Sequence, residues 1–205
     1  MRFPLLVLLL IGLAAALASS EERPPVDPAR LDAVATSGFS TAPADWQSRL
    51  VPDETMRQCS AHHNNPPVPI ANAIREREQA SVVYPSDGQF LGDWKKGEAI
   101  AQSGYGLRFT DYPPRNSNGG NCYGCHQITK QEISFGTLGP SLLGYGKMRG
   151  FGAAEAKAAY QKIYSSQAVL PCSNMPRFGT NKILSIDQIK DVVSLLMSPQ
   201  SPANE

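Results

Sequence analysis

Apolar residues recur at three- and four-residue intervals near the end of the chain, which is the pattern of an amphipathic helix. Ser185 and Gln188 open this stretch with the spacing of a capping box, and Pro199 closes it. We therefore expect a C-terminal helix whose apolar stripe belongs to the core. The stripe consists of Ile186, Ile189, Val192, Val193, Leu196 and Met197.

A second amphipathic stretch lies between Asp93 and Gln102. Asp93 is a suitable N-cap, because its side chain accepts a backbone N–H and its charge faces the positive end of the helix. Gly97 lies in mid-helix, where glycine costs about 1 kcal/mol relative to alanine. We expect this glycine to permit a close crossing with the C-terminal helix.

Three shorter helices are predicted at residues 53–61, 70–80 and 153–164. In the second of these, the charged residues 75–78 are expected to face solvent, away from Ile70 and Ile74. Residues 81–84 form a brief β-prone run. Loops that contain Gly and Pro separate these elements.

The first 18 residues have the features of a secretory signal peptide. Arg2 supplies the positive charge, an apolar stretch follows it, and residues 16–18 form a small-x-small cleavage site. No cysteine follows that site, so we do not expect a lipid anchor, and no later stretch is apolar enough to cross a bilayer. We expect an exported protein with a Pro-rich extension at residues 19–88 and a compact domain at residues 89–205.

The chemistry of the chain centres on the contiguous run Cys122-Tyr123-Gly124-Cys125-His126. This C-x-x-C-H pattern is typical of haem c attachment, in which each thiol forms a thioether with one porphyrin vinyl group and the adjacent imidazole ligates the iron. The spacing suits one turn of helix. The alternatives are a redox dithiol, which needs a βαβ context, and half of a zinc site, which needs more Cys or His ligands.

Cys59 and Cys172 are the other two of the four cysteines. In an exported protein we expect them to form a disulfide, which would close a long loop and contribute about 2–4 kcal/mol. A reactive thiol at one of the two positions is the alternative.

A Gly-rich segment between Gly136 and Gly144 follows the motif, and its glycines let the backbone approach a neighbouring group closely. We expect that group to be the imidazole of His126, with the Pro140 carbonyl accepting a hydrogen bond from the free ring N–H. Such a bond orients a ligating histidine and strengthens its donation. An ordinary loop is the alternative.

Met175 is the expected second axial ligand of the iron, because it lies in a loop that the following proline stiffens. Met148 and Met197 are the competing methionines, the first close in sequence to the histidine side and the second on the apolar stripe. His62 and His63 are expected to be surface residues, with ligation as an alternative. Haem with Met/His ligation has a raised potential and suits electron transfer.

These motifs resemble class I cytochromes c and, more specifically, SoxX, the monohaem subunit of the sulfur-oxidation cytochrome SoxAX. The M-P-R-F-G loop and the S-P-x-S-P-x-N ending are the most specific parts of the resemblance. The Pro-rich extension departs from compact cytochromes and is similar to the longer form of SoxX. The resemblance covers residues 90–205 and is carried by residues 120–126, 139–146, 174–179 and 198–204.

The resemblance implies an all-α class I cytochrome c fold with one covalent haem c, ligated by His126 and Met175, and a partly helical extension. It also implies a periplasmic heterodimer with a SoxA subunit. That subunit would carry the bond-forming site of an L-cysteine S-thiosulfotransferase, which joins thiosulfate to a cysteine of the SoxYZ carrier. This chain would accept the released electrons and pass them to a downstream cytochrome c.

A free-standing electron shuttle is the alternative function, and a sensor haem with a displaceable Met175 is a less expected one. The chain carries 19 basic and 18 acidic residues, a formal net charge of +1. This balance implies neither nucleic-acid nor membrane-surface binding, and it gives a shuttle little electrostatic steering towards its partners.

Overall fold

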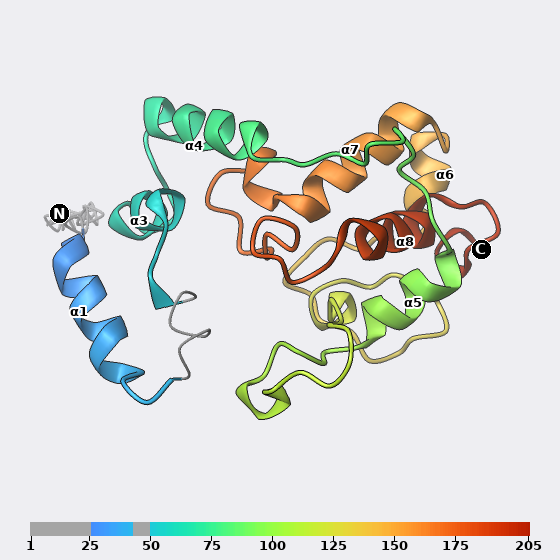
Figure 1. The fold of residues 1–205 in the computed structure, drawn as a ribbon. Helices are drawn as coiled ribbons and strands as arrows, with labels where there is room; N and C mark the ends of the chain where they lie inside the picture. The colour runs from blue at the N-terminus through green and yellow to red at the C-terminus, as the bar shows by residue number, and fades with distance from the viewer. Residues whose placement is uncertain (1–25, 43–49) are drawn as a thin grey trace, which may run out of the picture.

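The computed structural model describes residues 26–42 and 50–205, and within these ranges it contains helices, turns and loops but no strand (Figure 1). The expected all-α class is therefore confirmed for the described residues. The predicted signal peptide, residues 1–18, lies outside them. The α-helices are α1 (Pro28–Gly38), α3 (Glu54–Ala61), α4 (Val68–Ala80), α5 (Trp94–Gln102), α6 (Tyr145–Arg149), α7 (Ala153–Tyr164) and α8 (Ile186–Met197), with single 3-10 turns at Phe109–Asp111, Cys122–Gly124, Ser166–Ala168 and Pro202–Asn204.

The core is built around α8, whose apolar stripe is buried as expected except for Ile186, which is half-buried. Helix α5 crosses α8 at Gly97, where an added Cβ would lie 2.0 Å from the backbone oxygen of Asp191. The two helix backbones therefore touch at this point, which confirms the expected reason for a glycine in mid-helix. Helix α7 contributes Tyr160 and Ile163 to the same core cluster.

The helix starts follow the capping residues read from the sequence. The side chain of Ser185 accepts from the backbone N–H of Gln188, and the Gln188 side chain accepts from the Ser185 N–H, which completes the capping box. Asp93 caps α5 and Asp53 caps α3, each through a 2.9 Å bond from a backbone N–H.

The extension contains more helix than the pattern predicts. Helices α3 and α4 are confirmed, with α4 beginning two residues early, but α1 was not expected. None of the residues of α1 is buried, and Val34 is 64% exposed, so it has no apolar stripe to detect. The β-prone residues 81–84 form no strand; Val82 is buried in an irregular segment.

Glu78 corrects the expectation that all of the charged residues of α4 face solvent. Its side chain is buried and forms an ion pair with Arg177, which lies 99 residues further along the chain. The buried face of α4 therefore carries both Ile74 and a carboxylate.

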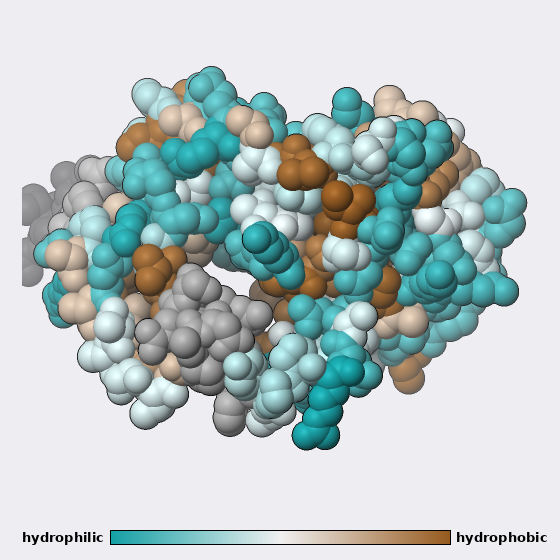
Figure 2. Space-filling model, viewed as in Figure 1, coloured by the Kyte–Doolittle hydropathy of each residue, from teal (hydrophilic) through white to brown (hydrophobic). Residues whose placement is uncertain are grey.

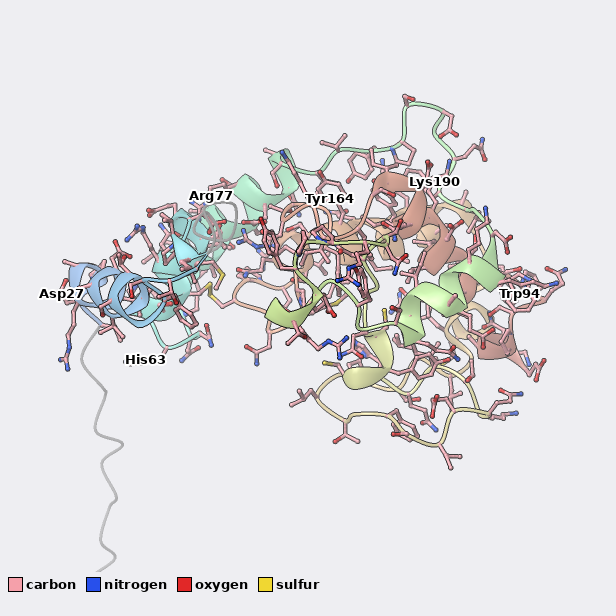
Figure 3. All side chains as sticks on the ribbon, turned by 60° about the horizontal axis from the view of Figure 1, so that its bottom comes forward. Asp27, His63, Arg77, Trp94, Tyr164 and Lys190 are labelled. Atoms are coloured by element: carbon pink, nitrogen blue, oxygen red, sulfur yellow. A yellow bond between two sulfur atoms is a disulfide. The ribbon has the colours of Figure 1, made fainter. Side chains whose placement is uncertain are left out.

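The extension lies against the rest of the protein through contacts of several kinds. Cys59 and Cys172 form the expected disulfide, visible beside α3 and α4 in Figure 3. Gln79 donates to the carbonyl of Ala168 at 3.0 Å, and the Tyr160 hydroxyl donates to the carbonyl of Val83 at 2.8 Å. Figure 1 places α1 and α3 at one end of the molecule and α5, α6 and α8 at the other.

Most of the face in Figure 2 is hydrophilic, with hydrophobic side chains gathered in its middle. In the described ranges no helix has both the length and the apolar character needed to cross a membrane.

Candidate functional site

The C-x-x-C-H motif forms a single turn of helix. Its residues Cys122–Gly124 are a 3-10 turn, and the N–H groups of Cys125 and His126 both donate to the carbonyl of Cys122, at 3.1 and 2.9 Å. Asn121 enters the turn in the left-handed region, with φ 46°. The geometry expected for the motif is therefore present: both thiols and the imidazole project from one turn.

The end of α5 holds this turn in place. The N–H of Gly120 donates to the carbonyl of Ile100 at 2.8 Å, and the N–H of Asn121 donates to the carbonyl of Ser103 at 2.8 Å. These two backbone bonds join the motif to the helix that crosses α8. The position of the turn is consequently set by the core of the protein.

Cys122 and Cys125 are both half-buried free thiols and are not joined to each other. The sulfur of Cys122 and the Cδ1 of Leu184 lie together beside Gly120. Burial among such groups raises the pKa of the Cys122 thiol to about 12. A redox dithiol relies instead on a lowered thiol pKa.

A zinc site finds no support in the surroundings of these thiols. The part of the chain that the structure describes has no group of three or more His, Cys, Asp or Glu side chains placed to hold a metal ion. Structural zinc sites use four such ligands.

The imidazole of His126 has the expected backbone partner. Its Nδ1 lies 2.8 Å from the carbonyl oxygen of Pro140. Because a carbonyl oxygen only accepts, Nδ1 carries a proton, and in the neutral imidazole the lone pair then lies on Nε2. A ligating histidine needs this tautomer, and the bond also fixes the orientation of the ring.

The Gly-rich segment lies along the motif, as its composition predicts. Three backbone N–H groups of this segment donate to carbonyls of residues 123–127 at 2.7–2.9 Å: Gly136 to Tyr123, Gly139 to Cys125 and Leu142 to Gln127. An added Cβ at Gly139 would lie 2.1 Å from Cε1 of His126. The backbone therefore contacts the imidazole directly.

We expect Gly139→Ala to displace the His126 ring, because its methyl group cannot occupy the position of Cε1. The hydrogen bond to Pro140 would be lost, and overpacking of this kind costs about 1–3 kcal/mol. Denaturant unfolding and the NMR signal of the ring Nδ1–H measure the two effects. Gly152→Ala is the control, since a Cβ there meets nothing within 4 Å. A retained ring signal and unchanged stability would contradict the expected contact.

The three methionines considered as iron ligands lie in different environments. Met197 is 2% exposed in the core, and Met148 is 71% exposed on the short helix α6. Met175 is half-buried and packs against the core cluster, as Cys122 does. His63 is exposed, and Figure 3 places it near Asp27, at the end of the molecule opposite Trp94. These positions favour Met175 among the sequence candidates.

The loop that carries Met175 is fixed on both sides. Three residues before it, Cys172 is disulfide-bonded to Cys59. Two residues after it, Arg177 pairs with Glu78. The Met175 carbonyl itself accepts from the Ser166 hydroxyl. The M-P-R-F-G motif identifies this loop in the sequence, but it does not indicate that Glu78 anchors the loop. The only sequence signal for Glu78 is that an acidic residue lies on the apolar side of α4.

The residues present fit a haem c. The donor set is a pair of thiols at attachment spacing, an imidazole with its Nε2 lone pair available, and a thioether on a fixed loop. In the same loop, Thr180 Oγ1 is buried and has no hydrogen-bond partner within the described residues. Such an orphaned hydroxyl is suited to a polar group of a bound ligand.

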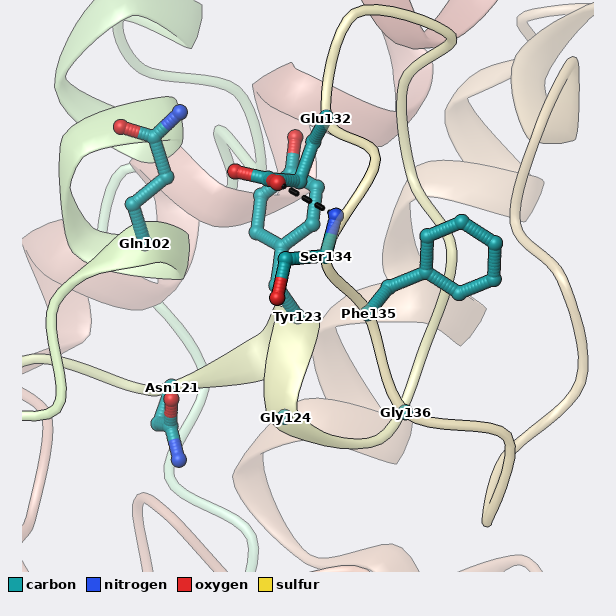
Figure 4. A pocket seen from close by; sticks show the side chains of 8 residues that line it. All are labelled: Gln102, Asn121, Tyr123, Gly124, Glu132, Ser134, Phe135 and Gly136. Atoms are coloured by element: carbon teal, nitrogen blue, oxygen red, sulfur yellow. Dashed lines mark hydrogen bonds between the residues drawn. The ribbon is translucent and has the colours of Figure 1, made fainter.

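A cavity of about 310 Å³ borders the motif on another side, shown in Figure 4. Tyr123 and Gly124 line it. The two motif thiols, His126 and Met175 are not among its lining residues. Glu132 accepts from the backbone N–H of Ser134 at 2.7 Å within it. This polar cavity is distinct from the set of haem-binding candidates.

No family model matches the chain. The chain is 38% identical over 138 residues to a protein of Aquifex aeolicus (strain VF5) described as an uncharacterized lipoprotein. The match covers 67% of this chain and 65% of that protein, slightly less than two thirds of the relative's length. The similarity relates the two chains but assigns neither of them a chemistry.

Proposed function

We propose that this protein is a c-type cytochrome that transfers electrons in the cell envelope. The observation that carries the proposal is the C-x-x-C-H turn together with the 2.8 Å bond between His126 Nδ1 and the Pro140 carbonyl. A histidine held in this tautomer beside two free thiols has the arrangement that covalent haem requires.

Each residue of the site has a specific task in this function. Cys122 and Cys125 would attach the group covalently, and His126 would ligate its iron through Nε2. Pro140 orients the imidazole through its carbonyl, and Met175 would supply the thioether ligand. When bound with these two ligands, haem supplies reversible one-electron transfer at a raised potential.

We further propose that the electrons come from thiosulfate oxidation, with this chain as the SoxX-like subunit of a SoxAX-type complex. In this arrangement a SoxA-like partner carries the bond-forming site, SoxYZ carries the substrate cysteine, and a downstream cytochrome c removes the electrons. The M-P-R-F-G loop and the S-P-x-S-P-x-N ending support this proposal.

The S-P-x-S-P-x-N ending has a structural use in this chain. Asn204 is buried, and its side-chain amide donates to the carbonyls of Leu196 and Ser198 at 3.0 and 2.9 Å. Its Oδ1 accepts from the N–H groups of Gly146 and Lys147 at the start of α6. The ending therefore joins the end of α8 to the segment that follows the Pro140 turn.

Two observations support an exported location, and the proposed haem agrees with it because covalent haem attachment takes place outside the bacterial cytoplasm. The Cys59–Cys172 disulfide suits an oxidising compartment. The Aquifex relative is described as a lipoprotein, a class of envelope protein. We propose the periplasm as the site of function.

The second candidate is a free-standing electron shuttle. The net charge of +1 and the extension packed along one side favour a fixed partner instead. Purification of the native protein separates the two: a stable stoichiometric partner supports the subunit, and a monomer supports the shuttle. Thiosulfate-dependent reduction with SoxA and SoxYZ present tests the substrate.

Haem attachment is tested by producing the full chain in a periplasm with a cytochrome c maturation system. We expect a red protein that keeps one haem after denaturation, measured by mass spectrometry and by the spectrum of the pyridine complex. A Cys122→Ala/Cys125→Ala variant should carry no covalent haem, whereas Cys59→Ala/Cys172→Ala should retain it. Colourless protein from the unaltered chain would refute the function.

A further inference from the structure

We propose that Glu78, through its ion pair with Arg177, positions the loop that carries Met175 and so sets how firmly the thioether is held on the iron. This inference rests on the proposed function. It gives the extension a role in the haem site and makes Glu78 a positioning residue, although it lies outside the cytochrome-like part of the sequence.

The ion pair is buried, and both of its side chains make a further hydrogen bond. Arg177 Nη1 lies 2.7 Å from Glu78 Oε1, and the two side chains are 6% and 4% exposed. The second oxygen, Glu78 Oε2, accepts from the Ser165 hydroxyl at 2.6 Å. Arg177 Nη2 lies 2.7 Å from Asp53 Oδ2, the N-cap of α3. One guanidinium therefore binds both of the extension's well-packed helices.

A pair in this position has a large effect on the loop. Removing one partner of a buried, hydrogen-bonded ion pair is strongly destabilising. Without Glu78, the buried guanidinium of Arg177 keeps only the half-exposed carboxylate of Asp53 as a charge partner, which favours an opened loop in which water solvates it. Arg177 lies only two residues after Met175, so its solvation would draw this part of the loop outwards.

The other contacts that hold the Met175 loop also come largely from the extension. Cys172 is bonded to Cys59 on α3, and Gln79 donates to the carbonyl of Ala168 at 3.0 Å. Held in this way, the loop has lost its conformational freedom before any ligand bond forms. A thioether on a preordered loop binds iron more firmly than one on a free loop.

The consequence is a shift between two populations, one with Met175 on the iron and one with the loop open. Because imidazole competes for the open coordination position, its apparent affinity reports the open fraction directly. An ion pair that served global stability alone would leave this affinity unchanged, so the titration distinguishes the two roles.

The test compares Glu78→Gln with the unaltered protein, both as full-length, haem-loaded proteins in the ferric state. We expect the apparent imidazole affinity to rise at least about tenfold in the variant. The charge-transfer absorption of the methionine–ferric bond should weaken, and the midpoint potential should fall. Asp87→Asn is the matched control, since it breaks the ion pair with Lys190 elsewhere in the extension. An unchanged imidazole affinity in Glu78→Gln would overturn the proposal.

Two further variants keep the outcome interpretable. If Glu78→Gln fails to accumulate, Asp53→Asn is used instead, because its carboxylate is 48% exposed and binds the same guanidinium. It should raise imidazole affinity by a smaller factor, and no rise would count against the inference. Met175→Ala should bind imidazole more tightly than any of these. If it does not, the assignment of Met175 is wrong and the inference falls with it; if it does while Glu78→Gln is unchanged, the inference alone is wrong.

Discussion

Replacing Met175 with alanine is expected to lower the reduction midpoint of the haem-loaded protein by a sizeable part of the roughly 0.8 V that axial ligands span. In the proposed site the thioether would raise the potential, and its loss would leave the iron with His126 and a ligand from solvent. Potentiometric titration measures the change. Carbon monoxide binding by the reduced protein should appear in the variant and be absent from the unaltered chain.

The other two candidate methionines, Met148 and Met197, provide matched controls for this substitution. Met148 is 71% exposed, so Met148→Ala should leave both the potential and the stability nearly unchanged. Met197 is buried in the core, so Met197→Ala should cost about 2–5 kcal/mol of unfolding free energy while the ligation stays the same. If the potential fell in the Met148 variant and not in the Met175 variant, Met148 would be the iron ligand in place of Met175.

The parts of the fold that depend on short-range patterns could be predicted from the sequence. The bounds of α7, the capping box of α8 and the caps of α3 and α5 are all encoded within a few residues of each element. The Gly97 crossing was also predictable, because a glycine in an otherwise regular helix needs a reason.

The parts that depend on distant partners could not be predicted. Glu78 looks like any other charge on a polar helix until Arg177 is placed beside it. Helix α1 buries no residue, so only its Asp27 cap and Pro28 mark it. Hydrophobic periodicity reports which face is apolar, and it gives no information about a carboxylate that is buried with its counter-ion.

The candidate site follows the same division. The thiols and His126 are contiguous, so their shared turn is a local property, and the Pro140 contact was predictable because the Gly-rich segment follows closely. The anchoring of the Met175 loop joins residues that lie far apart in the chain, 113 positions in the Cys59–Cys172 disulfide and 99 in the Glu78–Arg177 ion pair. Cysteine counting identified that disulfide, but no comparable count exists for ion pairs.

Gly97→Ala is expected to destabilise the protein by about 1–3 kcal/mol, although alanine is the better helix former. In an isolated helix the same change would stabilise by about 1 kcal/mol. Here the new Cβ would lie 2.0 Å from the backbone oxygen and 2.6 Å from the backbone carbon of Asp191. Backbone atoms in the middle of α8 cannot rotate away, so the two helices must separate. The denaturant midpoint should fall with little change in its slope.

Gly38→Ala is the control that separates the clash between α5 and α8 from the effect of helix propensity. Gly38 ends α1, and a Cβ there meets nothing within 4 Å, so this variant should be as stable as the unaltered protein or slightly more so.

Separation of α5 from α8 in Gly97→Ala should also displace the C-x-x-C-H turn, because Gly120 and Asn121 are hydrogen-bonded to the end of α5. We therefore expect Gly97→Ala, unlike Gly38→Ala, to bind imidazole more readily in its ferric state. A Gly97→Ala variant more stable than the unaltered protein would mean that the helix backbones do not touch and that the motif is not held by their crossing.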